Sequence, residues 1–337
     1  MATADTLQGH PASDAGGTLQ VVTVRGPIDP AALGATLSHD HILMDGWDMF
    51  RSYAVILDDE ETAISELVRY RESGGGAICD PTNIGLKRDP EALRRVSEAS
   101  GVHVVMGAGW YRERVYPASI ATTSTNDLAD LLVRELTVGV GDTGIRPGFI
   151  GEIGTERGVI SPAEERVFRA AARASSRTGC PILTHTTHSG ELALEQIALL
   201  VEEGIPADRV IISHLGDRRE RRGLLAIAAT GVWLSVDNLA FITGYSPLEV
   251  RADNVAMLWA EGYGDRILLG NDICEVDALA INGGVGYSHV IRDFWPLLRE
   301  RGVTAEQFDA MTTANPARAY AYAAGAAVTA ARDAGHR

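Results

Sequence analysis

The sequence predicts a (β/α)8 TIM barrel in a single domain, and three observations favour that fold. Short apolar runs, rich in β-branched residues, alternate with amphipathic helical stretches along most of the 337 residues. The predicted strands are apolar on both faces, as is typical of parallel strands covered by helices. Eight such strand–helix pairs follow one another, and eight is the number that closes a barrel. A doubly wound open sheet is the alternative architecture.

The strands are predicted from the apolar runs, and the helices from apolar residues spaced three and four apart. Strands are expected at 35–41, 76–80, 103–109, 148–153, 181–185, 210–214, 232–237 and 267–272. Helices are expected at 60–72, 90–100, 127–138, 162–177, 191–203, 220–230, 248–261 and 287–301, with a short further one at 305–313. Helix 162–177 has a clear start signal in Ser161, Pro162 and Glu164. Residues 21–30 are predicted to form a hairpin across the bottom of the barrel.

The two ends of the chain are small and polar, which predicts tails at 1–18 and 324–337 on either side of a barrel at 19–323. The first 17 residues lack the charged start and apolar middle of a signal peptide. The sequence has no run of roughly 18 apolar residues. Its three cysteines, Cys79, Cys180 and Cys274, form no CxxC pair. These features predict a cytoplasmic protein with no membrane partner.

Charge and lysine content exclude several classes of function. The formal net charge of −15 argues against nucleic acid and anionic membrane surfaces as partners. Lys87 is the only lysine, so the Gly-Lys-Ser/Thr of a phosphate-binding loop is absent, and most Schiff-base chemistry is removed with it. A small-molecule substrate is the remaining expectation.

Polar side chains stand at the ends of the predicted strands. His39 and His41 are two positions apart and would share one face of a strand. The last residues of the strands are His39 and His41, Asp80, Gly109, Glu152, His185, His214, Asp237 and Asp272. Each of these alone is more often a helix cap or a satisfied buried group. Because the carboxyl ends of barrel strands meet at one rim, their repetition predicts a functional site there.

Four histidines and two carboxylates from this set are more ligands than one tetrahedral zinc ion uses. They suit two divalent metal ions a few ångströms apart that share a carboxylate. A bridging Glu152, together with Asp272, would partly neutralise two cations that repel each other. Zinc is the first expectation, with manganese, cobalt and iron as alternatives.

Six motifs carry a resemblance to the phosphotriesterase family of the amidohydrolase superfamily. They are Leu33-Gly34-x-Thr36-Leu37-x-His39-x-His41, Gly151-Glu152-Ile153-Gly154, Thr184-His185-Thr186, Ser213-His214-Leu215, Gly270-Asn271-Asp272-Ile273 and Gly283-Gly284-x-Gly286-Tyr287-Ser288-His289. They lie in order between Val21 and Tyr322. The resemblance implies a barrel with a binuclear metal centre and hydrolase activity.

The resemblance also implies a role for each ligand. It assigns His39, His41 and Asp272 to the first metal ion, and His185 and His214 to the second. The bridge is a carboxylated lysine in many members and a glutamate in others. Since Lys87 follows the second strand, the resemblance assigns the bridge to Glu152, as in the phosphotriesterase-related type. The implied reaction is hydrolysis by a metal-bridging hydroxide, with Asp272 as the catalytic residue that takes the proton.

Residues around the predicted site leave the substrate open. Asn238 follows the seventh strand, where relatives active on organophosphates resemble each other in having a histidine that relays protons to an aspartate matching Asp217. Many acyl-homoserine lactonases have an arginine there. Trp110 and Tyr111 could wall a substrate pocket, and Arg112 could bind a carboxylate, sulfonate or phosphate. Alternatively, Arg112 pairs with nearby acids on a solvated loop.

Several functions are compatible with these residues. The first is hydrolysis of a lactone or carboxylic ester. The second is hydrolysis of a small N-acylated amino or sulfonic acid, to which glutamate-bridged relatives point and whose anion Arg112 would hold. A non-catalytic metal-binding protein is disfavoured by the complete ligand set, and a phosphoester hydrolase is a weaker alternative. A homodimer is common for barrels of this resemblance. His188 and Cys274 are expected to serve structure more than chemistry.

Overall fold

Eight parallel strands form one sheet in this computed structural model, which describes residues 17–187, 190–241 and 244–324. The strands are β3 (Ala35–Leu37), β6 (Gly75–Asp80), β7 (His103–Ala108), β8 (Phe149–Gly154), β9 (Ile182–His185), β10 (Val210–Ile212), β11 (Trp233–Val236) and β12 (Ile267–Leu269). Among these eight strands, neighbours in the sheet are also neighbours in chain order, since β4 and β5 belong to a separate small sheet. The Ser38 amide donates to the Leu269 carbonyl at 2.8 Å, so the first and last strands meet. The barrel prediction is confirmed, and the doubly wound alternative is excluded.

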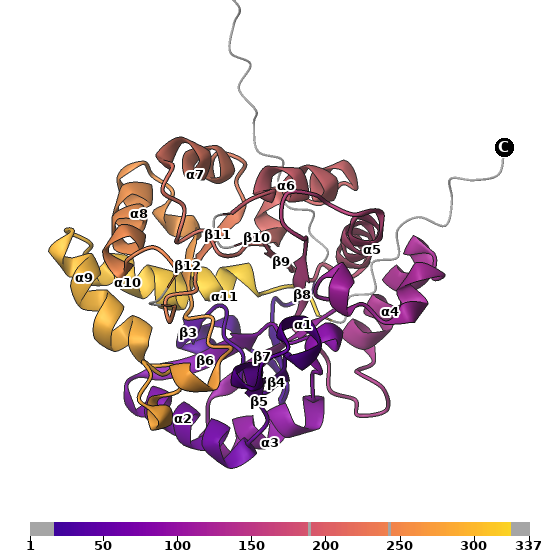
Figure 1. Ribbon diagram of the computed structural model, residues 1–337, viewed down its shortest axis with the longest axis horizontal. Helices are drawn as coiled ribbons and strands as arrows, with labels where there is room; N and C mark the ends of the chain where they lie inside the picture. Colours follow the sequence, from indigo (N-terminus) through magenta and orange to yellow (C-terminus); the bar gives the residue numbers. More distant parts are fainter. Residues whose placement is uncertain (1–16, 188–189, 242–243, 325–337) are drawn as a thin grey trace, which may run out of the picture.

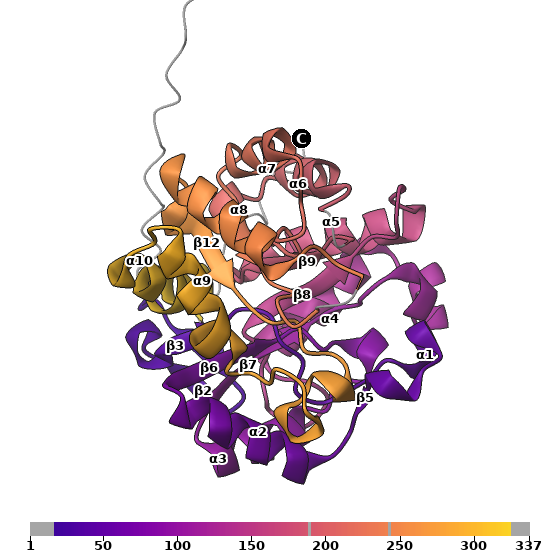
Figure 2. The ribbon, with the colours of Figure 1, turned by 60° about the vertical axis from the view of Figure 1, so that its left-hand side comes forward.

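The helices form a ring around the strands (Figures 1 and 2). They are α2 (Glu60–Glu72), α3 (Pro90–Ser100), α4 (Thr125–Thr137), α5 (Pro162–Thr178), α6 (Ala193–Glu202), α7 (Arg221–Ala228), α8 (Leu248–Ala260) and α9 (Trp295–Glu300). Helix α5 begins as predicted, because Ser161 and Glu164 each accept the other's backbone N–H. Within the part of the chain that is described, we find no helix with the length and apolarity to cross a membrane.

The bottom of the barrel is closed by the predicted hairpin, which consists of β1 (Val21–Thr23) and β2 (Gly26–Ile28). The Val24 amide donates to the Val104 carbonyl at the start of β7, at 2.9 Å. Most of the two predicted tails lies outside the described residues, and the domain limits stay a prediction.

The lower half of the barrel interior is filled by an apolar cluster that we call the lower core. Its members are Val21, Leu33, Ala77, Cys79, Val105, Phe149, Leu183, Ile211, Trp233, Leu268, Ala319, Tyr320 and Ala321. Phe149 and Tyr320 pack edge to face, with ring centroids 5.4 Å apart. This packing supports the strands from below and leaves the upper interior for polar groups.

The last helices differ from the prediction. Instead of one helix over 287–301, a π turn at Val290–Phe294 leads into α9. The predicted helix 305–313 runs further, through α10 (Ala305–Asp309), a second π turn at Ala310–Ala314 and α11 (Asn315–Ala319). Pro296 and Pro316 stand just after the two π turns. Because proline has no N–H, each wide turn absorbs the missing helical hydrogen bond.

A short excursion between β3 and α2 was not predicted. It contains β4 (Met44–Asp45), α1 (Trp47–Phe50) and β5 (Ile56–Leu57), with β4 and β5 paired antiparallel. The two strands are two residues long, too short to produce a recognisable alternation. The Lys87 ammonium, 3.0 Å from the Asp45 carboxylate, ties the excursion to the segment after β6.

Candidate active site

The predicted strand-end residues do meet at the upper rim, although not all of them belong to strands. Strand β3 ends at Leu37, so His39 and His41 lie beyond it, and the expected strand 35–41 is too long. The cause is the junction with β12, where the Ser38 and His41 amides donate to the Leu269 and Ile273 carbonyls. The two imidazoles still converge, with ring centroids 5.8 Å apart.

Six side chains from five strand ends form what we call the histidine–carboxylate cluster: His39, His41, Glu152, His185, His214 and Asp272. Their ligand atoms fall into three overlapping groups, within each of which they lie no more than 4.8 Å apart. The cluster is buried. Its two most exposed side chains, Asp272 and His185, are each only 13 % exposed. Residues more than two hundred positions apart therefore share one small volume.

Glu152 occupies the centre of the cluster. Its Oε1 is 3.5 Å from Nε2 of His41, and its Oε2 is 3.6 Å from Nε2 of His39. The same Oε2 is 3.0 Å from Nδ1 of His185 and 3.7 Å from Nε2 of His214. One carboxylate thus faces both pairs of imidazoles, as a bridging ligand must.

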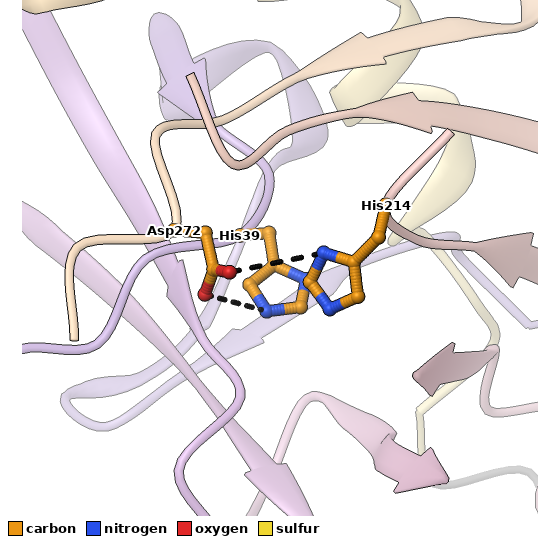
Figure 3. A group of neighbouring side chains, drawn as sticks. All are labelled: His39, His214 and Asp272. Atoms are coloured by element: carbon orange, nitrogen blue, oxygen red, sulfur yellow. Dashed lines mark ion pairs between the residues drawn. The ribbon is translucent and has the colours of Figure 1, made fainter. Parts of the chain in front are cut away.

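Asp272 faces the cluster from another side, after β12. Its Oδ1 is 3.4 Å from Nε2 of His39, and its Oδ2 is 3.8 Å from Nδ1 of His214 (Figure 3). The same Oδ1 is 3.6 Å from Nε2 of His41. The backbone approaches closely here, since a Cβ on Gly270 would lie 2.7 Å from the carbonyl oxygen of His39. Glycine at that position lets the end of β12 reach the His39 segment.

In three of the imidazoles, Nδ1 contacts a side chain from outside the cluster. Asp237 accepts a hydrogen bond from Nδ1 of His214 at 2.7 Å, and its other oxygen is 3.3 Å from Nδ1 of His39. Nδ1 of His41 shares a hydrogen bond with the Thr82 hydroxyl at 2.8 Å. Such contacts orient imidazole ligands at metal sites. Nε2 of His39 is buried and has no hydrogen-bond partner in the described chain, so the donor set fits a cation.

Burial and charge shift the pKa values within the cluster in opposite directions. Burial lowers the pKa of His39, but the carboxylates of Asp237, Glu152 and Asp272 outweigh it and raise that pKa to about 9. Burial lowers the pKa of His185 to about 3, although Glu152 opposes the shift. Burial raises the pKa of Glu152, but His185 and His39 overcome this and hold it well below its usual range. A metal ion must therefore displace a proton from His39.

A cavity of about 240 Å³ opens above the cluster. One wall is apolar. It consists of Met44, Phe50 and Val55 from the excursion and Leu86 from the segment after β6. The Tyr111 hydroxyl lies 3.4 Å from both ring nitrogens of His185. The cavity therefore combines an apolar wall with a polar floor, as small-molecule sites do.

Of the four predicted substrate-contacting residues, Tyr111, Arg112 and Asn238 line this cavity and Trp110 does not. Trp110 instead lines a separate hollow beside Leu128 and Leu132 of α4. Successive side chains of an extended segment point to opposite sides, so turning Tyr111 inward turns Trp110 outward. The expectation that Trp110 walls the substrate pocket is not met.

Two roles were predicted for Arg112, binding an anionic substrate group or pairing with a nearby acid, and its contacts agree partly with each. Its Nη1 is 3.7 Å from the Glu156 carboxylate, which is an ion pair without a hydrogen bond, and its guanidinium lies 5.0 Å from the centre of the Tyr111 ring. Its Nε is buried and has no hydrogen-bond partner among the described residues. A Cβ on Gly154 would lie 3.0 Å from Cγ of Arg112, so the glycine leaves room for this side chain. Arg114 is mostly exposed.

The remaining predictions have mixed outcomes. Cys274 lines the cavity as a free thiol, and burial raises its pKa well above the usual range. His188 lies outside the described residues. The sequence placed Asp237 at the end of a strand, but its contacts with His214 and His39 were not predicted. The excursion residues Met44, Phe50 and Val55 were missed because no local pattern signals them.

The closed barrel and the histidine–carboxylate cluster at its rim define the class of binuclear metal-dependent hydrolases. The model of the phosphotriesterase family matches residues 19–320, and the chain therefore belongs to that family, with Glu152 in the bridging position.

Three relatives illustrate the range of the family. An N-acetyltaurine hydrolase from Tetraodon nigroviridis is 32% identical, over 88% of this chain and 96% of its own length. The structure of a phosphotriesterase homology protein from Escherichia coli, complexed with phosphate in its active site, is similar with a TM-score of 0.83 and 32% identity, over 86% of this chain and 99% of that one. A lactonase from Listeria monocytogenes is similar with a TM-score of 0.84 and 27% identity, over 89% of this chain and 98% of that one.

Proposed function

We propose that the chain hydrolyses the acyl bond of a small carbonyl substrate at two divalent metal ions held by the histidine–carboxylate cluster. The observation that carries the proposal is the position of Glu152, whose two oxygens face four imidazoles at the floor of a cavity. His39, His41 and Asp272 would hold one ion, and His185 and His214 the other, with Glu152 between them. Bound cations would lower the pKa of a water molecule from about 15.7 toward about 7 and polarise the scissile carbonyl.

Asp272 is the proposed general base. It lines the cavity, it contacts imidazoles assigned to both ions, and a carboxylate there can accept the proton of the attacking water. Burial raises its pKa, and the histidines around it, His214 first, offset the rise only in part. A proton taken up by Asp272 could then pass to the leaving group.

The first substrate candidate is a lactone or carboxylic ester. Two observations support it: the similar lactonase, and the apolar wall of Met44, Phe50, Val55 and Leu86, which suits an acyl chain. Tyr111, beside His185, would contact the carbonyl end of such a substrate.

The second candidate is an N-acylated amino or sulfonic acid. It is supported by the similar N-acetyltaurine hydrolase and by Arg112, a cavity-lining cation whose Nε lacks a partner among described residues. A guanidinium binds carboxylate and sulfonate in a planar, bidentate way. A phosphoester is the weakest candidate, because Asn238 cannot relay a proton by titration.

A substrate screen tests this proposal. The protein, loaded separately with zinc, manganese, cobalt and iron, is assayed against lactones, carboxylic esters, N-acyl amino and sulfonic acids, and phosphoesters. Hydrolysis of acyl substrates that disappears on chelation and returns with metal is expected. Turnover confined to phosphoesters, or acyl hydrolysis that persists in metal-free protein, contradicts it. Zinc as the native metal, the cytoplasm and a homodimer stay predictions.

A further inference from the structure

Asn238 is a buried cavity residue with an unused hydrogen-bond acceptor. Only 1 % of the residue is exposed, and it lines the cavity together with His214 and Asp272. Its Oδ1 is buried and has no hydrogen-bond partner in the described part of the chain. Leaving such an atom unsatisfied costs free energy, so a ligand that supplies a donor gains from pairing with it.

A hydrogen bond to Asp217 sets the orientation of the Asn238 amide. Its Nδ2 donates to Oδ2 of Asp217. The other oxygen of Asp217 accepts from the Ser246 amide at 2.9 Å and from Nε of Arg251 at 3.0 Å. Rotating the amide by half a turn would place Oδ1 against the Asp217 carboxylate, and two acceptors repel each other. The oxygen is therefore directed away from Asp217 in the folded protein.

The support behind Asn238 is itself rigid. Arg251 is 1 % exposed and also donates to the backbone carbonyls of Leu239, at 3.3 Å, and Phe241, at 2.9 Å. A buried ion pair with its remaining donors satisfied does not exchange partners at low cost. Asp217 is thus held in place, and it holds Asn238 in turn.

A fixed acceptor distinguishes substrates by whether they carry a donor. A secondary amide has an N–H next to its scissile carbonyl, whereas the matching ester or lactone has an oxygen that can only accept. A site built to pair with a substrate N–H disfavours an analogue that lacks it, because its own polar group is then left unpaired.

We propose that Asn238 is a specificity-determining residue that accepts a hydrogen bond from the N–H of a secondary amide substrate. The inference rests on the acyl hydrolysis proposed above and selects the N-acyl acid from its two candidates. Asn238 also has a left-handed backbone with φ of 55°, which asparagine tolerates. A purely structural role would explain the residue through that backbone and Asp217 alone, and the test separates the two roles.

The test compares three substrates that differ at one atom or group. N-acetylglycine carries the N–H, O-acetylglycolate replaces it with oxygen, and N-acetylsarcosine replaces its hydrogen with a methyl group. The metal-loaded wild type and the variants Asn238→Ala and Asn238→Gly are assayed for kcat/KM on each. Glycine accepts the left-handed backbone without strain, so it controls for the backbone effect of alanine.

In both variants we expect kcat/KM for N-acetylglycine to fall about tenfold to hundredfold. For O-acetylglycolate and N-acetylsarcosine we expect changes of no more than about threefold, because neither substrate has the donor to lose. The control Thr187→Val removes a different polar group of the cavity lining and should leave the ratio between the three substrates unchanged. Metal content and melting temperature verify that each variant is folded and loaded.

An equal loss on all three substrates, or no loss on N-acetylglycine, overturns the role of Asn238 while leaving acyl hydrolysis intact. If the loaded wild type hydrolyses none of the three, the wider screen described above decides acyl hydrolysis. Calorimetric binding of N-acetylglycine to the wild type and to Asn238→Ala then decides the N–H contact separately. Weaker binding to the variant supports that contact, and equal binding overturns it.

Discussion

The two ends of strand β8 show how one barrel divides stability from chemistry. Phe149, at the lower end, is fully buried in the lower core against Tyr320. Glu152, three positions along the same strand, lies among imidazoles at the floor of the cavity. The pairing of β8 with β9 shifts register between Ile150 and Ile153, so the regular ladder is interrupted between the two. The lower end is ordered by apolar packing, and the upper end departs from regular geometry to present polar groups.

The same contrast holds for the strands that follow. His214, Asn238 and Asp272 come shortly after β10, β11 and β12, and their φ values are 63°, 55° and 56°. Left-handed backbone costs free energy in residues other than glycine, and it costs least in asparagine and aspartate. Three consecutive strand ends accept that cost, and each turns a polar side chain toward the cavity.

The largest effect is expected from Glu152→Gln, which changes only the upper end of β8 and should leave the lower core intact. An amide keeps the shape of the side chain but loses the negative charge that two cations must share, so the second metal ion should be lost and turnover should fall below detection. Elemental analysis and kcat measure the two effects. Glu98→Gln, on an exposed face of α3, serves as the control. Two metal ions per chain in Glu152→Gln would remove Glu152 as the bridge.

Asp272→Asn should separate catalysis from metal binding. The variant retains an oxygen that can ligate but loses the base, so kcat should fall by about 10²–10⁴-fold while much of the metal stays bound. Full activity in this variant is the result that would refute the assignment of Asp272.

Phe149→Ala should break the lower end and leave the upper end intact. Removing a fully buried phenyl ring costs about 3–5 kcal/mol of unfolding free energy. Denaturant unfolding measures that loss, and kcat of the folded, metal-loaded variant should stay within about twofold, since distant sites act nearly independently. A variant of unchanged stability that cannot bind metal would show that the two ends are not separable.

Arg112→Ala should act on substrate selection at the upper rim. Loss of a charge-assisted contact, worth about 1.5–3 kcal/mol, should raise KM for anionic substrates about tenfold to hundredfold and leave neutral ones nearly unchanged. Arg114→Ala, on the mostly exposed neighbour, is the matched control. Equal KM changes for charged and neutral substrates would exclude Arg112 from anion recognition.

The smallest effect is a proton count. Since the folded pKa of His39 is raised from 6.5 to about 9, its contribution to the stability of metal-free protein is present below pH 6.5 and is lost as the pH rises through 9. At pH 8 the imidazole is mostly protonated, and the pKa of His214 is also raised well above its usual value, because Asp237 outweighs the effect of burial. Metal binding should therefore release at least one proton per chain. Calorimetry in two buffers of different ionisation enthalpy measures the release. Identical heats in the two buffers would contradict the raised pKa.

Local sequence patterns predicted much of the barrel but not its upper surface. Helix α5 follows directly from Ser161, Pro162 and Glu164, because a capping box is a local structure. The excursion at 42–57 has no periodicity to detect, and its wall residues became visible only in the folded cavity. Trp110 and Tyr111 show the same limit, because which of two neighbours faces a cavity depends on what lies on each side.

The sequence by itself determined the order of strands and helices, the eight-fold repeat and the residues at the strand ends, since these depend on periodicity and on spacing along the chain. Tertiary structure alone decided that the Glu152 carboxylate lies between 3.0 and 3.7 Å from four imidazoles, that Asp237 contacts two of them, and that Asp217 and Arg251 orient Asn238. Those relations join residues on different strands, and only closure of the barrel brings their side chains into contact.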